Sequence, residues 1–104
     1  MLWVITCDTV PNMDAIREKT QAAHHAYMKA QKDIMILAGA VRSDDGKTVK
    51  GSLFLLHMNS RAEAQAFVDA EPYNQAGIFT NFKITRMTRG QWNPGAAEGA
   101  DIPK

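Results

Sequence analysis

His24 and Arg17 are the residues whose types and spacing first suggest chemistry in this sequence. They lie seven positions apart, with Thr20 between them, in a segment from 13 to 32 that contains no Gly or Pro. Such a segment is expected to form one long helix, and the seven-residue spacing brings both side chains to one helical face. An imidazole beside a guanidinium is suited to handling an anion, although a solvated helix face is the ordinary alternative.

Other positions carry polar groups that could join this chemistry, but each has an ordinary structural role when it is taken singly. Asp8 follows the first apolar run, where an aspartate commonly forms a turn. Ser52 can be a plain hydrogen-bonding residue of a strand, and the adjacent Gly51 can mark a bulge. Glu71 and Pro72 can simply end a helix, because proline disfavours helical geometry in the residue before it.

The three histidines do not predict a metal site. His25 is adjacent to His24, so it faces another side of the helix and is expected at the surface. His24, His25 and His57 lack a zinc-ligand spacing, and the single cysteine, Cys7, cannot supply a thiolate pair. We therefore expect no bound metal.

Charge and composition exclude several classes of function. The 104 residues include twelve Lys and Arg and eleven Asp and Glu, and these charges are scattered, so we expect no nucleic acid binding. The first apolar run ends at Asp8, and no later run is long enough to cross a bilayer, so we expect no signal peptide and no membrane partner. A lone cysteine is typical of a reducing compartment, and we expect a cytoplasmic protein.

Apolar runs and turn signals predict six regular elements. An Asp45-Gly46 step predicts a hairpin turn, and Ser60 with Glu63 forms a capping box. The segment 72–77 is expected to be a loop or a single helical turn. The strands are expected at about 2–7, 34–42, 51–58 and 78–88, and the helices at about 13–32 and 60–71.

The order strand, helix, strand, strand, helix, strand predicts an α+β domain with the ferredoxin-like βαββαβ fold, in which two helices cover one face of an antiparallel sheet. We expect this domain to span 1–89 and a tail to span 90–104. The other sheet face carries Phe54, Leu56, Phe82 and Ile84, or else the residues adjacent to them in each strand. Either set is too apolar to remain exposed to solvent. A homodimer would bury it. Trp92 would then clasp the partner or cap the sheet of its own subunit.

A set of short segments, taken in order, resembles the YCII-related family. The resemblance extends from the first strand to the last and leaves out the tail. Its most specific piece is Pro72-Tyr73-x-x-Ala76-Gly77, which closes the second helix. The other pieces are the opening 2–5, Asp8, Arg17, 24–26, 37–39, Gly51-Ser52 and 78–79.

This resemblance implies a dimeric α+β barrel and cofactor-free lyase chemistry, including elimination of HCl from chlorinated hydroxyhydroquinones. By position, His24 matches the family's histidine, and Glu71 stands where the family has the aspartate of its histidine–aspartate centre. Arg17 and Ser52 match residues that stabilise an oxyanion. The proline that positions the dyad corresponds to Pro72.

Three departures from the family pattern leave the substrate open. Glu71 is longer than aspartate and must fold back to reach the imidazole, and Asp69 is a nearby substitute. The family's Ala-Gly-Pro appears here as Ala-Gly-Ala at 38–40. Asp8, which matches the residue that holds the arginine, lies one residue further from Arg17 than usual, and the 43–50 hairpin is short.

We therefore predict a small cofactor-independent lyase, dehydrochlorinase or isomerase that acts on hydroxylated aromatic compounds, halogenated ones among them, or on their ring-derived products. A carboxylate that accepts from one nitrogen of His24 fixes the tautomer and leaves the other nitrogen as a general base. Arg17 and Ser52 would stabilise the oxyanion that forms.

Two other classes of function remain open at this stage. A non-catalytic dimeric module could bind a small metabolite in the same pocket. Other dimeric α+β barrels include cofactor-free monooxygenases and haem-binding proteins, and His24 or His57 could ligate a haem, but this third class rests on an analogy between folds.

Overall fold

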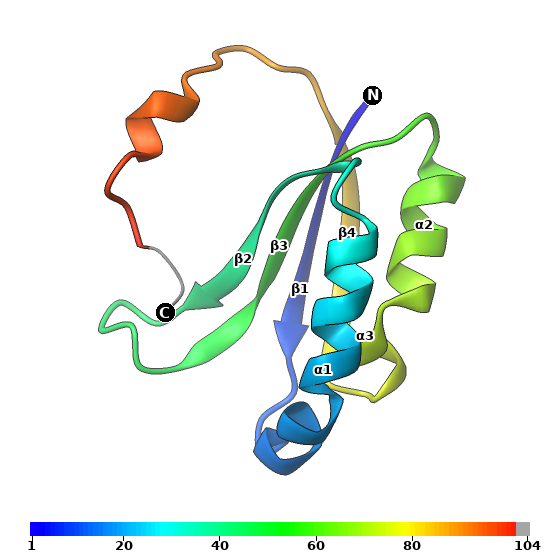
Figure 1. Ribbon diagram of the computed structural model, residues 1–104, viewed down its shortest axis with the longest axis vertical. Coiled ribbons are helices and arrows are strands. Elements are labelled where there is room, and N and C mark those ends of the chain that lie inside the picture. The colour runs from blue at the N-terminus through cyan, green and yellow to red at the C-terminus, as the bar shows by residue number, and fades with distance from the viewer. Residues whose placement is uncertain (102–104) are drawn as a thin grey trace.

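The computed structural model describes residues 1–101, which form four strands, three α-helices and one short 3-10 helix (Figure 1). The strands are β1 (Leu2–Thr9), β2 (Met35–Arg42), β3 (Val49–His57) and β4 (Phe79–Met87). The helices are α1 (Asp14–Ala30), α2 (Arg61–Ala70), α3 (Pro72–Gln75) and the 3-10 helix η1 (Pro94–Ala97).

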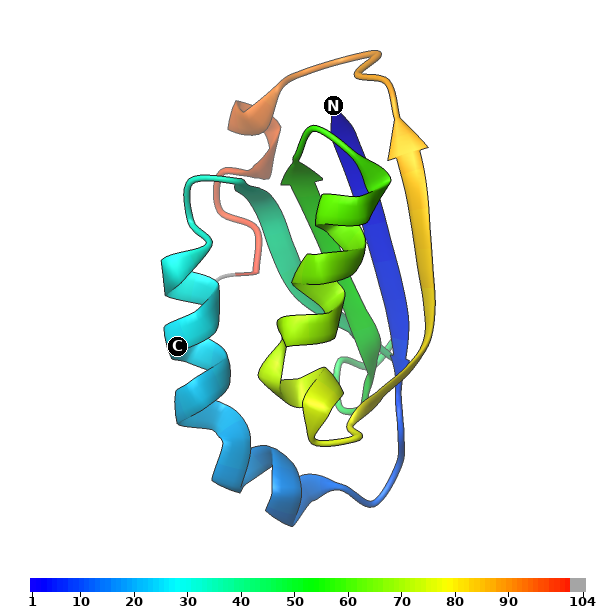
Figure 2. The same ribbon diagram turned by 90° about the vertical axis from the view of Figure 1, so that its right-hand side faces the viewer.

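The strands form one sheet in the order β2-β3-β1-β4, and every neighbouring pair is antiparallel. Helices α1 and α2 both lie on one side of this sheet, and residues 88–101 arc over the other side (Figures 1 and 2). The strand order and the one-sided helices are those of the ferredoxin-like fold. The predicted α+β architecture is therefore confirmed.

The second half of the chain folds as its local sequence signals predict. The Ser60 side chain accepts a hydrogen bond from the Glu63 amide at 3.2 Å and begins α2. Helix α2 ends at Ala70 because Pro72 favours an extended conformation at Glu71, which has φ −68° and ψ 124°. Pro72 then begins the single helical turn α3, which was one of the two expectations for this segment.

The core lies between the sheet and the helices. Trp3, Ile5 and Cys7 alternate along β1 with half-buried or exposed residues, so every second side chain of this strand points toward the helices. The remaining buried apolar residues are Phe54, Leu56, Ala64, Phe67, Val68, Tyr73, Ile78 and Phe79. Phe82 and Ile84 of β4 pack against this core, whereas no residue from 90 to 101 does.

None of the residues of helix α1 is fully buried, so this helix packs against the rest of the molecule through partly exposed side chains. Tyr27 and Met28 pack against the edge of the core, and the Tyr27 hydroxyl donates to the backbone carbonyl of Phe67 at 2.9 Å. This hydrogen bond ties α1 to α2. Since His24 lies one turn before Tyr27, the same attachment holds the histidine beside α3.

The uncovered sheet face is apolar on its β2 and β3 portions. Phe54 and Leu56 pack under the helices, so the apolar residues of β3 that lie on the open face are their neighbours Leu53 and Leu55. Leu37 of β2 pairs with Leu55 and is 59% exposed. In the described residues, no helix is long and apolar enough to cross a membrane.

Candidate functional site

His24 and Glu71 form the centre of the site, because His24 Nδ1 and Glu71 Oε1 are joined by a hydrogen bond between α1 and the α2–α3 junction. The glutamate side chain is 1% exposed and the histidine side chain 16% exposed. The second oxygen, Oε2, accepts from the backbone amide of Asn74 at 3.1 Å. Both carboxylate oxygens therefore have partners, which makes burial of this acid tolerable.

The local sequence explains why a glutamate can reach the imidazole. Glu71 ends α2 and is also the N-cap of α3, so its backbone is extended between two helices. From this corner the side chain turns back over α3, where the Asn74 amide fixes one oxygen and leaves the other facing His24. The longer side chain, which marked a departure from the family pattern, thus fits an N-cap geometry.

Asp69 is the other carboxylate that the sequence offered to His24. Its side chain is exposed and accepts from the Gln65 amide at 2.9 Å. The histidine contacts Glu71 instead.

The His25 ring lies near His24, with the two ring centroids 5.7 Å apart. Tyr73 completes the surroundings of His24. Its ring is stacked on the imidazole, with centroids 3.9 Å apart and planes 9° apart. The Tyr73 ring also packs at nearly a right angle to the Phe79 ring, with centroids 5.7 Å apart and planes at 87°. This contact fixes the tyrosine against the core. The stack on Tyr73 therefore restrains the tilt of the His24 ring, and the hydrogen bond to Glu71 restrains its rotation within the ring plane.

Arg17 lies on the helical face of His24, as predicted from the seven-residue spacing, and it reaches the same aromatic ring. Its Cζ is 5.0 Å from the Tyr73 ring centroid, and its Nη2 donates to Thr9 Oγ1 at 3.5 Å. Tyr73 thus contacts both His24 and Arg17. The arrangement places one positive charge beside the imidazole without a direct contact between them.

Asp8 has a different partner from the one that its position suggested. Its Oδ2 accepts from Asn81 Nδ2 at 3.0 Å, across the β1–β4 pair. Within residues 1–101 no ion pair joins Asp8 to Arg17. The guanidinium is held by Thr9, the next residue along β1.

Ser52 lies on the same side of the sheet as the dyad, because it pairs with the buried Cys7. Burial raises the pKa of the Cys7 thiol to about 11, with smaller raising effects from Glu71 and Asp8. The Ser52 backbone hydrogen bond and the Arg17 charge lower the pKa of the same thiol. Cys7 is therefore a neutral thiol in the floor of the site and does not serve as a nucleophile.

The same charges act on the two tyrosines near the dyad. Burial raises the pKa of the Tyr73 hydroxyl, Arg17 lowers it, and Glu71 raises it. Burial and Glu71 also raise the pKa of Tyr27. Both phenols are thus neutral at physiological pH.

Sequence reasoning identified His24, Arg17, Ser52 and Glu71 but assigned no role to Tyr73. The signal was present in the Pro-Tyr segment, which served only to mark the family resemblance. Stacking on a residue 49 positions away cannot be predicted from spacing. No group of three or more His, Cys, Asp or Glu side chains suited to a metal occurs in the described part of the chain.

The chain is similar to one protein family and to several solved structures. The YCII-related domain matches residues 1–88. A solved structure of 5-chloro-2-hydroxyhydroquinone dehydrochlorinase TftG from Burkholderia phenoliruptrix AC1100, in complex with 2,5-dihydroxybenzoquinone, is 28% identical, covers 86% of this chain and 96% of its own, and superposes with a TM-score of 0.76.

A second solved structure shows the fold alone. Rv0793 from Mycobacterium tuberculosis is 16% identical, covers 86% of this chain and 98% of its own, and has a TM-score of 0.52. Among curated proteins, nothing matches significantly.

Proposed function

This chain belongs to the YCII-related domain family, and we propose that it is a cofactor-independent lyase or isomerase acting on hydroxylated, including chlorinated, aromatic compounds. The observation that carries the proposal is the hydrogen bond between His24 Nδ1 and the buried Glu71 carboxylate. The similarity to a dehydrochlorinase of a chlorinated hydroxyhydroquinone supports the substrate class.

In the proposed reaction His24 acts as the general base. A carboxylate on Nδ1 requires that this nitrogen carry the proton, which leaves the lone pair of Nε2 free to accept one. The buried Glu71 also stabilises the imidazolium that forms. The Tyr73 stack holds the ring in one orientation during both states.

Loss of HCl then needs no external electron acceptor. In the keto tautomer of a chlorinated quinol, the carbon that bears chlorine is saturated. When Nε2 removes a ring hydroxyl proton, the oxygen lone pair forms a carbonyl, the ring double bond shifts, and chloride leaves with the C–Cl electron pair. Arg17 and the Ser52 hydroxyl would stabilise the negative charge as it develops on oxygen. The same proton transfers, without a leaving group, perform an isomerisation.

The alternative of a non-catalytic binding module drew its support from the replacement of aspartate by Glu71. That support is reduced, because the longer side chain contacts His24 and has both oxygens hydrogen-bonded. An aromatic ligand that is bound but never converted would restore the alternative.

We also propose that the protein is a cytoplasmic homodimer that closes its open sheet faces against each other. The lone and buried Cys7 suits a reducing compartment. Leu37 and Val41 of β2 are 59% and 45% exposed, which is unusual for large aliphatic side chains of a sheet. Trp92 borders a cavity of about 640 Å³ together with Leu55 and Met87, so the tail reaches the same face.

The test is turnover of 5-chloro-2-hydroxyhydroquinone and related chlorinated and unchlorinated quinols, followed by chloride release and ring absorbance. His24→Gln should lose roughly 100-fold or more of the activity, the usual contribution of a general base. His57→Gln is the control, because this exposed histidine ends β3 and pairs with Leu2, at the opposite end of β1 from the dyad. Undiminished activity in His24→Gln would contradict the proposal.

A further inference from the structure

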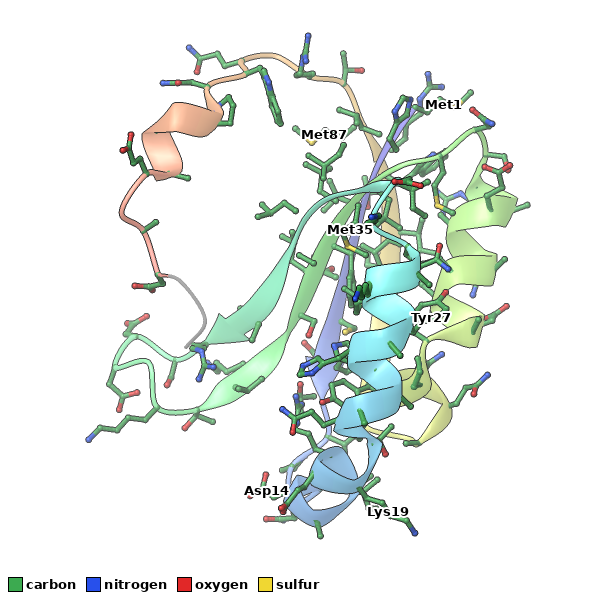
Figure 3. The ribbon with its side chains drawn as sticks, in the orientation of Figure 1. Met1, Asp14, Lys19, Tyr27, Met35 and Met87 are labelled. Carbon is green, nitrogen blue, oxygen red and sulfur yellow. The ribbon has the colours of Figure 1, made fainter. Side chains whose placement is uncertain are left out.

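A cavity lies at the N-terminal end of α1, and apart from Arg17 the residues that line it have no role in the mechanism above. It has a volume of about 670 Å³ and is bounded by the β1–α1 loop on one side and by residues 47–50 of the β2–β3 hairpin on the other. In Figure 1 these two segments flank the lower end of the sheet, and Asp14 marks the helix side in Figure 3. This volume is within the range of small-molecule sites.

Positive charge dominates the lining of this cavity. Arg17, Lys47 and Lys50 line it, and Asp14 is its one acidic residue. The chain as a whole has a net charge of only +1, so this is a local excess and not a general feature of the surface. Clustered cations in a concave site attract anions.

The cavity shares two residues with the catalytic centre. Arg17 and Thr9 line it, and they are joined by the hydrogen bond that positions the guanidinium. The same guanidinium lies over Tyr73, which is stacked on His24. A ligand anchored in the cavity would therefore lie next to the cation that is proposed to stabilise the reacting oxygen.

We propose that this cavity binds a carboxylate substituent of the substrate, so that the natural substrate is a hydroxylated aromatic acid. This inference rests on the proposed function. A carboxylate matches the planar donor fork of an arginine, and the two lysines add positive charge on the hairpin side. Asp14 reduces the excess charge, which suits a singly charged group.

The experiment uses two ligands that differ only by the carboxylate, 2,5-dihydroxybenzoate and hydroquinone, with calorimetric measurement of binding. Wild type is compared with Lys47→Glu/Lys50→Glu. The control is Lys19→Glu/Lys32→Glu, which changes the net charge equally at two exposed lysines outside the cavity lining. In Figure 3, Lys19 projects away from the hairpin.

Wild type should bind 2,5-dihydroxybenzoate more tightly than hydroquinone. The cavity variant should weaken the acid about tenfold or more, as expected for reversing two charges near a carboxylate, while hydroquinone changes less than about twofold. Equal binding of the two ligands by wild type, no detectable binding of the acid, or equal effects of the cavity and control variants would overturn the inference. These outcomes are read from binding alone, so the inference can fail while His24-dependent turnover stands.

Discussion

The Glu71 side chain serves both a helix end and the candidate site. One oxygen caps α3 through the Asn74 amide and the other receives the Nδ1 proton of His24. An unpaired charge in this buried position would cost several kcal/mol. The two hydrogen bonds offset part of that cost and orient the carboxylate.

At the residue scale, the sequence predicted that His24 and Arg17 share one helical face, but not that the Tyr73 ring contacts both of them. Helical periodicity places Arg17 and His24 on one face. Tyr73 comes from α3, and its position over the imidazole depends on how α1 packs against the α2–α3 corner. That packing is a tertiary property that no local pattern encodes.

Cys7 gives a pH dependence that can be measured at this scale. Its pKa in the folded protein is about 11, against 9.0 for an ordinary thiol. Between these two values the unfolded chain loses the thiol proton while the folded chain keeps it. The contribution to stability is therefore fully present below pH 9 and is lost as the pH rises to about 11.

Urea unfolding of wild type and Cys7→Ser at pH 8 to 10.5 tests this expectation. The free energy of unfolding should fall more steeply with pH in wild type than in the variant. Tyr27 and Tyr73 contribute to the slope in both proteins, because the pKa of each is also raised, and so the difference between the slopes isolates the thiol. Identical slopes would show that Cys7 titrates normally.

At the element scale, the site depends on a close approach of β1 and β3. A Cβ placed on Gly51 would lie 2.0 Å from the backbone oxygen of Cys7. The glycine is thus required for the strands to pair at this point, which in turn sets the position of the adjacent Ser52. The sequence suggested a bulge at Gly51, but only the structure shows which atom occupies the space.

Gly51→Ala should therefore destabilise the protein by about 1–3 kcal/mol, the usual range for overpacking. Gly90→Ala is the control, because a Cβ there would meet nothing within 4 Å, and its effect should stay within about 0.5 kcal/mol. Both values come from chemical denaturation. An unchanged free energy of unfolding in Gly51→Ala would mean that the β1 backbone can shift at Cys7 without loss of stability.

At the scale of the whole molecule, the order of elements was enough to predict the fold, because turn signals and capping residues mark most of the boundaries. The sequence could not show which of the two alternating sets of side chains in each strand faces the helices. Phe54 and Leu53 are both apolar, so alternation alone does not distinguish the covered face from the open one. Burial of Phe54 under the helices leaves Leu53 and Leu55 on the face that a partner would cover.

The proposed dimer predicts that the wild-type protein sediments at twice its monomer mass of 11.5 kDa. Leu37→Asp/Val41→Asp should yield monomers at micromolar concentration, because a symmetric interface would bury four added carboxylates. Ile16→Asp is the control, since Ile16 is 41% exposed on α1, away from the open face. Analytical ultracentrifugation measures all three proteins. A monomeric wild type would contradict the dimer.

The central claim is that Glu71 holds the proton of His24 on Nδ1 and leaves Nε2 as the base. A ¹⁵N–¹H spectrum of the imidazole rings, recorded where His24 is neutral, tests this claim without any substrate. Wild type should show a bare Nε2 and a protonated Nδ1, and Glu71→Gln should lose this single tautomer, while the exposed His57 at the far end of β3 gives the same spectrum in both proteins. A wild-type His24 that carries its proton on Nε2 would contradict the account.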